Sequence, residues 1–137
     1  MPRPRPDARI ENAIADYKYA TDKLSETSRT IGFGLVGVFF SVAFAESAVL
    51  TSFMNHNKLA LFGVGVLGST TILFDYLHYL FGYWASVEAG ISQGDFNVRG
   101  WRYRTQSAFF WLKQVLAFLG TVVLIYALFS ELISIRS

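Results

Sequence analysis

Residues 31–53 read IGFGLVGVFFSVAFAESAVLTSF, an apolar stretch with a single charged residue, Glu46. At 1.5 Å per residue, a helix of this length crosses a hydrocarbon core of roughly 30 Å. Two further stretches are similar: residues 59–84, which begin with the uncharged run LALFGVGVLGSTTILF, and residues 107–130, whose only charge is Lys113. The sequence therefore predicts three transmembrane helices, over about 31–53, 59–84 and 107–130.

The composition of the whole chain also indicates a membrane protein. Of the 137 residues, 53% are hydrophobic, 17% aromatic and 16% charged, whereas a typical soluble domain is about one quarter charged. A soluble helical bundle would need polar helix faces, and the three apolar stretches have none of useful width. A cleavable signal peptide does not fit, because the first apolar run begins only at Ile31. We expect an all-α integral membrane protein.

The basic residues gather on one side of the predicted spans. Those of the N-terminal segment and of the loop before the third span are Arg3, Arg5, Arg9, Lys18, Lys23, Arg29, Arg99, Arg102 and Arg104. The short loop 54–58 has only Lys58, and the C-terminal tail has only Arg136. Because loops rich in Lys and Arg stay in the cytoplasm, we expect a multi-pass protein of the bacterial inner membrane, with the N-terminus cytoplasmic and the C-terminus periplasmic.

Aromatic residues support this orientation. Trp and Tyr are enriched where a membrane meets water, and here they follow the second span and precede the third. The interface anchors that we expect, together with the basic residues beside them, are Tyr83, Trp84, Trp101, Arg102, Tyr103 and Arg104.

The N-terminal segment divides into two parts. Residues 1–6, MPRPRP, alternate Pro and Arg and are expected to be extended. Residues 7–30 contain neither Pro nor Gly, and from Ile10 to Ile31 apolar or small side chains recur in steps of four and three, which predicts an amphipathic helix. We expect this cytoplasmic helix to continue into the first span, as one helix to about residue 50. Its mixed charge favours a protein partner over a lipid surface; the alternative is a solvated extension without a partner.

Ionisable residues inside the predicted spans are the functional candidates, because a charge in hydrocarbon is costly. They are Glu46, Asp75, His78 and Lys113. Asp75 and Lys113 fall at similar depths, which predicts a structural ion pair. His78 lies one helical turn after Asp75, so a proton relay through these two side chains is the alternative. Glu46 has no basic residue at its depth; it is either protonated and hydrogen-bonded between helices, or ionised in the water-filled lumen of an oligomer.

Small side chains form stripes along the first two spans. The positions that we expect to support helix–helix packing are Gly34, Ser41, Ala45, Ala48, Gly65 and Ser69. Such stripes let transmembrane helices approach closely, either within one protomer or between copies. Because three helices bury little surface by themselves, we expect a homo-oligomer or a subunit of a larger membrane complex.

No sequence pattern points to catalysis. The chain has no Cys and only two His residues, and it lacks a phosphate-binding loop, a G-x-S-x-G motif and an H-E-x-x-H motif. We therefore expect a protein that is not an enzyme, with no metal, cofactor, nucleic-acid partner or small-molecule substrate, and with the bilayer as its surroundings. The first functional hypothesis is a homo-oligomeric protein of channel-like or membrane-permeabilising type, in which Glu46 faces the lumen. The alternative is a non-catalytic accessory subunit of a larger membrane complex.

Overall fold

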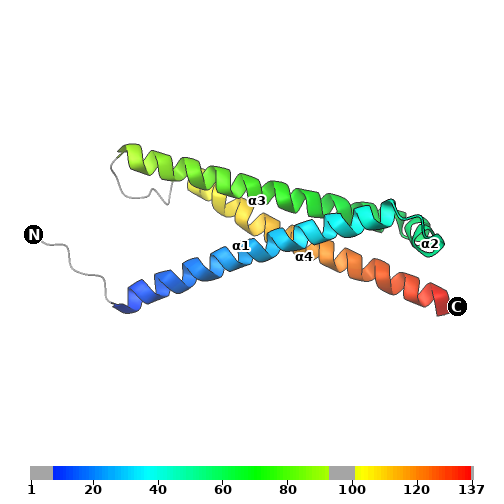
Figure 1. Cartoon of the computed structure of the whole chain (residues 1–137). Helices are drawn as coiled ribbons and strands as arrows, with labels where there is room; N and C mark the ends of the chain where they lie inside the picture. Colours follow the sequence, from blue (N-terminus) through cyan, green and yellow to red (C-terminus); the bar gives the residue numbers. More distant parts are fainter. Residues whose placement is uncertain (1–7, 93–100, 137) are drawn as a thin grey trace, which may run out of the picture.

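The computed structural model describes residues 8–92 and 101–136, and these residues form four α-helices without a strand (Figure 1). Their bounds are α1 Ala8–Ala43, α2 Ala48–His56, α3 Lys58–Ser92 and α4 Trp101–Arg136. The expected extended tail, residues 1–6, and the basic residue Arg99 lie outside the described residues.

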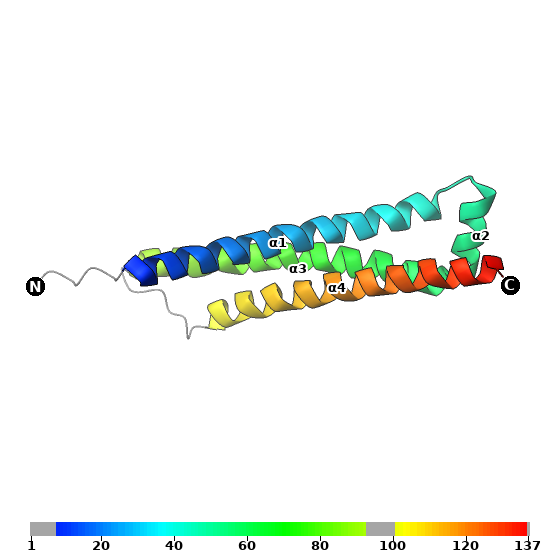
Figure 2. The same ribbon diagram turned by 90° about the horizontal axis from the view of Figure 1, so that it is seen from below.

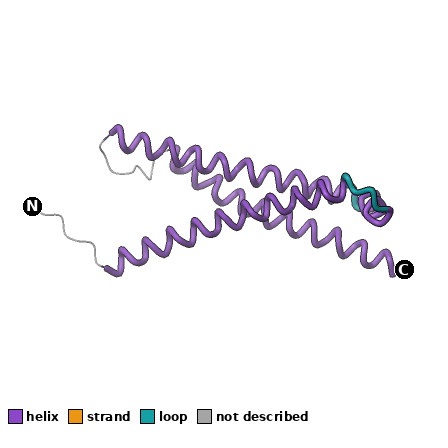
Figure 3. The backbone as a smooth tube through the Cα atoms, in the orientation of Figure 1, coloured by secondary structure: helices purple, strands orange, loops and turns teal. Residues whose placement is uncertain are grey.

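The three long helices run side by side, with α1 and α4 in one direction and α3 in the other (Figures 1 and 2). Helix α2 lies across one end of this bundle, and Figure 3 shows the non-helical residues between α1 and α2 at the same end. Helices α1, α3 and α4 contain 36, 35 and 36 residues, which corresponds to about 54 Å each. They are therefore much longer than a hydrocarbon core is thick.

Two helices are long and apolar enough to cross a membrane, over Lys58–Trp84 and Trp101–Ile133. The pair Ala15–Ala43 and Ala48–His56 passes the same criterion together but is bent by 113°, as in a broken span or a re-entrant segment. The all-α class is confirmed, and two or three membrane-compatible helices agree with the expected number of spans.

The expected straight helix to about residue 50 is wrong, and so is a first span that stays helical to residue 53. The predicted continuity between the N-terminal amphipathic helix and the first span is confirmed, because α1 passes Ile31 without a break. Helix α1 nevertheless ends at Ala43. A straight helix would carry the Glu46 carboxylate on into the apolar stretch; the break instead leaves Glu46 exposed at the end of the bundle. Ser47, in an extended conformation with ψ 130°, is the N-cap residue of α2, a position where Ser is favoured, although its side chain makes no capping hydrogen bond.

The loop expected over residues 54–58 is also wrong. Helix α2 continues to His56, and only Asn57 separates it from α3. The Asn57 side chain makes two hydrogen bonds to α4. Its Nδ2 donates to Glu131 Oε2 at 3.2 Å, and Ser130 Oγ donates to its Oδ1 at 2.6 Å. Asn57 thereby fastens the junction of α2 and α3 to α4. Beside it, an apolar core joins all four helices through Val42, Phe53, Leu61 and Ala127.

Candidate functional site

A buried carboxylate connects the three long helices. Asp75 of α3 has a side chain that is only 7% exposed, and its Oδ1 accepts a hydrogen bond from Lys113 Nζ of α4 at 2.5 Å. Its Oδ2 accepts from Arg29 Nε of α1 at 2.6 Å, and Ser25 Oγ, also on α1, donates to Oδ1 at 3.1 Å. The predicted ion pair between Asp75 and Lys113 is confirmed. Arg29 and Ser25 complete the site and were not predicted as parts of it.

The Lys113 ammonium is fully buried and donates two hydrogen bonds. Besides Asp75, it donates to Ser25 Oγ at 2.5 Å. Because Ser25 uses its single proton on Asp75, the Tyr79 hydroxyl, 3.3 Å from Ser25 Oγ, is the donor in that contact. The ammonium also lies 5.5 Å from the ring centroids of Tyr79 and Phe110, at a distance where cation–π attraction acts. These contacts explain how an apolar helix holds a buried lysine.

Arg29 is the outer member of this cluster, which we call the Asp75 cluster (Ser25, Arg29, Asp75, Tyr79 and Lys113). Its side chain is 43% exposed, and its guanidinium carbon lies 5.3 Å from the centroid of the Tyr79 ring. One helical turn earlier, Glu26 binds Lys23 at 2.8 Å instead. The cluster therefore contains two cations and one carboxylate.

His78 does not bond to Asp75 in this arrangement. Its Nδ1 lies 3.0 Å from the backbone oxygen of Gln106 on α4. Because a carbonyl oxygen can only accept, Nδ1 carries the proton. Both oxygens of Asp75 are occupied by Lys113, Ser25 and Arg29. This geometry supports the structural ion pair rather than a relay through Asp75 and His78.

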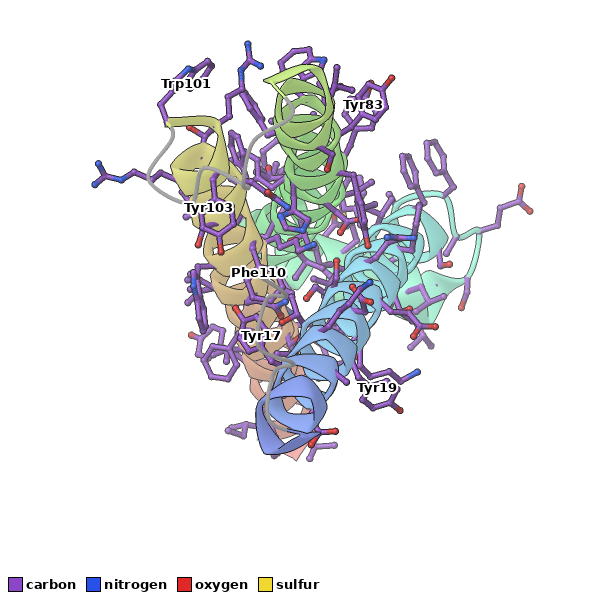
Figure 4. All side chains as sticks on the ribbon, turned by 90° about the vertical axis from the view of Figure 1, so that its left-hand side faces the viewer. Tyr17, Tyr19, Tyr83, Trp101, Tyr103 and Phe110 are labelled. Carbon is purple, nitrogen blue, oxygen red and sulfur yellow. The ribbon has the colours of Figure 1, made fainter. Side chains whose placement is uncertain are left out.

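A small cavity of about 190 Å³ adjoins His78 between α1 and α4. Its lining combines aromatic and polar side chains: Tyr17, Thr21, His78, Tyr103, Gln106, Ser107, Phe110 and Trp111. In Figure 4, which looks onto this end of the bundle, Tyr17, Tyr103 and Phe110 lie between α1 and α4. Trp101, Tyr83 and Tyr19 point outward in the same view. Of the expected interface anchors, Tyr103 thus faces inward; Tyr83, Trp84, Trp101 and Arg104 are exposed, and Arg102 is half-buried.

Glu46 lies apart from the other ionisable candidates. It is exposed in the turn between α1 and α2, whereas Asp75 and Lys113 are buried between the long helices. Its expected position within a helical span is therefore wrong. Among the described residues, Glu46 forms no ion pair within 4.0 Å.

The expected small-residue positions serve different purposes. Gly65 packs inside the protomer, because a Cβ added to it would lie 2.8 Å from Cγ of Phe39. Gly34, Ser41 and Ser69 are exposed. Ala45 and Ala48 lie beyond the end of α1, so the expected stripe that continues from Gly34 and Ser41 through these two residues is wrong, for the same reason as the straight helix.

A longer stripe of small residues instead follows the exposed face of α1. It consists of Thr27, Thr30, Gly34, Gly37 and Ser41, in alternating steps of three and four, and we call it the α1 seam. The hydroxyls of Thr27 and Thr30 donate to the backbone oxygens of Lys23 and Glu26 at 2.9 and 3.0 Å, within the same helix. A Cβ added to Gly34 or Gly37 would meet nothing within 4 Å. The spacing is visible in the sequence, but not which face of the helix is left uncovered.

No protein-family model, curated protein or solved structure matches this chain. Its function must therefore be inferred from the chemistry of the Asp75 cluster and the α1 seam.

Proposed function

We propose that this chain is a non-catalytic, multi-pass membrane protein that forms a homo-oligomer through the α1 seam. The observation that supports this proposal is the uncovered state of Gly34 and Gly37, which have no neighbour within 4 Å of an added Cβ. Glycines that pack inside the protomer, such as Gly65 and Gly68, have neighbours at 2.8 and 2.9 Å. A glycine within a helix costs about 1 kcal/mol relative to Ala, and close approach of a second backbone offsets that cost.

The physics of helix association in lipid supports the same face. Lipid chains are as apolar as leucine side chains, so helices associate through close backbone contact and small residues are favoured. Steps of three and four are the spacing of helices that pack at a shallow left-handed angle. Exposed rings of Phe33, Phe40 and Phe44 flank the α1 seam and add contact area around it.

The location that we propose follows from the distribution of Lys and Arg. An inner-membrane protein with a cytoplasmic N-terminus and a periplasmic C-terminus agrees with the basic N-terminal segment and with Arg99, Arg102 and Arg104, which lie just before α4 and in its first turn. The exposed aromatic residues Tyr83, Trp84 and Trp101 are suited to the cytoplasmic interface of the bilayer.

Channel-like conduction is the second candidate function, favoured by the position of Glu46. This exposed carboxylate lies directly after the last helical turn of the α1 seam. In an oligomer joined along the seam, the Glu46 residues of several copies would gather at one mouth, where a ring of acids attracts cations. The buried Asp75 and Lys113 pair with each other and give this candidate no support.

Cysteine cross-linking tests the proposed assembly. The chain has no Cys, so a Gly37→Cys variant carries one thiol on the seam. Gly63→Cys is a matched control, because Gly63 of α3 also has nothing within 4 Å of an added Cβ. Oxidation in membranes is expected to give a disulfide-linked dimer of the Gly37→Cys variant only. Equal cross-linking of both variants, or none of either, would contradict assembly through the α1 seam.

Mass measurement in mild detergent separates the remaining alternatives. A defined homo-oligomer that Gly37→Leu dissociates and Gly63→Leu preserves is the expected result. A stoichiometric foreign membrane protein on the seam, in place of a second copy, would replace this proposal by the accessory-subunit function. Ion flux in liposomes that is absent, or unchanged by Glu46→Gln, would exclude the channel-like candidate.

A further inference from the structure

The Asp75 cluster has a net charge of plus one, because it contains two cations and one carboxylate. Arg29 and Lys113 share a single carboxylate, both of whose oxygens already accept hydrogen bonds. Lys113 is fully buried and bonded to Asp75 and Ser25, whereas Arg29 is 43% exposed, so Arg29 is the cation of the cluster that an outside anion can reach. Only the Nε of Arg29 is bonded to Asp75, and the guanidinium also interacts with the Tyr79 side chain. A nearby acid, Glu26, is bonded to Lys23.

The depth of the cluster indicates which anion would meet this charge. A hydrocarbon core of roughly 30 Å corresponds to about 20 helical residues. Counting inward from the end where α2 lies, α1 ends at Ala43, α3 begins at Lys58 and the apolar part of α4 ends at Ile133. About 20 residues from these points reach positions near 23, 78 and 113, which is the level of the Asp75 cluster. Arg29 is about 21 Å from Ala43 along α1 and would thus lie about 9 Å inside the inner edge of the hydrocarbon, a depth from which an arginine side chain extends toward the lipid phosphates.

We propose that Arg29 binds the phosphodiester group of an anionic phospholipid in the cytoplasmic leaflet. The forked terminal nitrogens of a guanidinium match two oxygens of a phosphate. Asp75 holds Nε at 2.6 Å and the Tyr79 ring lies beside the guanidinium, so the fork is oriented before a lipid arrives. A lipid with one net negative charge neutralises the cluster, whereas a zwitterionic lipid brings a third cation together with its phosphate. This site requires the membrane insertion of the proposed function but not the self-association.

Native mass spectrometry of the full chain in mild detergent tests the site, with phosphatidylglycerol and phosphatidylcholine as probes. The wild-type chain is expected to bind phosphatidylglycerol more tightly, and Arg29→Gln is expected to weaken that binding about tenfold, as the loss of a charge-assisted hydrogen bond implies. Arg104→Gln removes an exposed arginine of α4 and is expected to change the binding less than about twofold. Arg29→Gln keeps the Lys113–Asp75 pair, so the fold should be retained, which circular dichroism checks.

Further variants and ligands make the test decisive. Arg29→Lys keeps the charge without the fork and is expected to bind with intermediate affinity. Equal binding of both lipids, or equal binding by wild type and Arg29→Gln, would overturn the inference. Displacement of phosphatidylglycerol by millimolar inorganic phosphate, with no preference between the two lipids, would assign the site to free phosphate instead. Lost lipid preference with intact cross-linking of the Gly37→Cys variant would refute this site alone and leave the proposed assembly standing.

Discussion

Gly120 of α4 lies directly against Leu35 of α1, and a Cβ added to Gly120 would be 2.5 Å from Leu35 Cδ1. On the α3 side, a Cβ added to Gly68 would be 2.9 Å from Leu35 Cβ. Leu35 therefore fills the space that two glycines leave between the three long helices. Because one side chain meets two glycines, this contact determines how closely α1 approaches its neighbours.

Gly120→Ala is expected to destabilise the bundle by about 1–3 kcal/mol, because the added methyl overpacks the contact with Leu35. Thermal unfolding in detergent measures this change. Gly63→Ala is the control: its methyl enters open space, and the gain in helix propensity is expected to leave stability unchanged or raised by up to about 1 kcal/mol. A Gly120→Ala variant as stable as Gly63→Ala would contradict the packing described above.

Neutralising both members of the ion pair is expected to cost less than the sum of the two single neutralisations. Lys113→Met leaves the carboxylate with Arg29 alone, and Asp75→Asn leaves two cations without a carboxylate; each is expected to cost about 3–5 kcal/mol. The double variant should cost less than the sum, by about 1–3 kcal/mol. Unfolding of the single and double variants in detergent gives the coupling directly, and strictly additive effects would dismiss it.

Asn57→Ala is expected to loosen α2 without disturbing the Asp75 cluster. The substitution removes the bonds to Glu131 and Ser130 and is expected to cost about 1–3 kcal/mol. Hydrogen exchange should become faster in α2 and stay unchanged around Asp75. His56→Ala, at an exposed neighbouring position, is the control. Unaltered exchange in the Asn57→Ala variant would show that the junction does not depend on this side chain.

Glu46→Gln is expected to change stability by less than about 0.5 kcal/mol, because Glu46 is exposed outside the helices. A carboxylate buried within a span behaves differently, since its neutralisation removes a desolvation cost. Thermal unfolding at neutral pH therefore distinguishes an exposed Glu46 from a Glu46 that is buried within a span. A marked gain in stability on substitution would place Glu46 within the apolar layer and contradict the break after Ala43.

The sequence was sufficient for the helical class and for the Asp75–Lys113 pair. Long runs without charge indicate helices that cross a membrane, and counting residues inward from the ends of two antiparallel helices brings Asp75 and Lys113 to one level. Arg29 was missed because hydropathy places it just outside the first span. Its partnership with Asp75 depends on how α1 lies against α3, which residue spacing along one chain does not determine.

The break between α1 and α2 was missed for a different reason. An apolar run is equally compatible with one straight helix and with two helices joined at an angle, so hydropathy does not distinguish them. The available signal was local: Glu46 interrupts the apolar run, and it is followed by Ser47, a residue type that favours helix starts. The α1 seam is visible as a spacing, but on a straight helix the stripe from Gly34 and Ser41 runs on through Ala45 and Ala48 and does not single out Gly37.

The Asp75 cluster also determines how the bundle can respond to bilayer thickness. Because Asp75 binds both Arg29 of α1 and Lys113 of α4, no long helix can slide along its neighbours by one turn without breaking an ion pair. In the proposed membrane-inserted state, a mismatch between the apolar length and the surrounding lipid would then be met by tilting of the whole bundle or by deformation of the bilayer. Membrane thickness would thus set a tilt angle, and the α1 seam would change its inclination together with the rest of the protein.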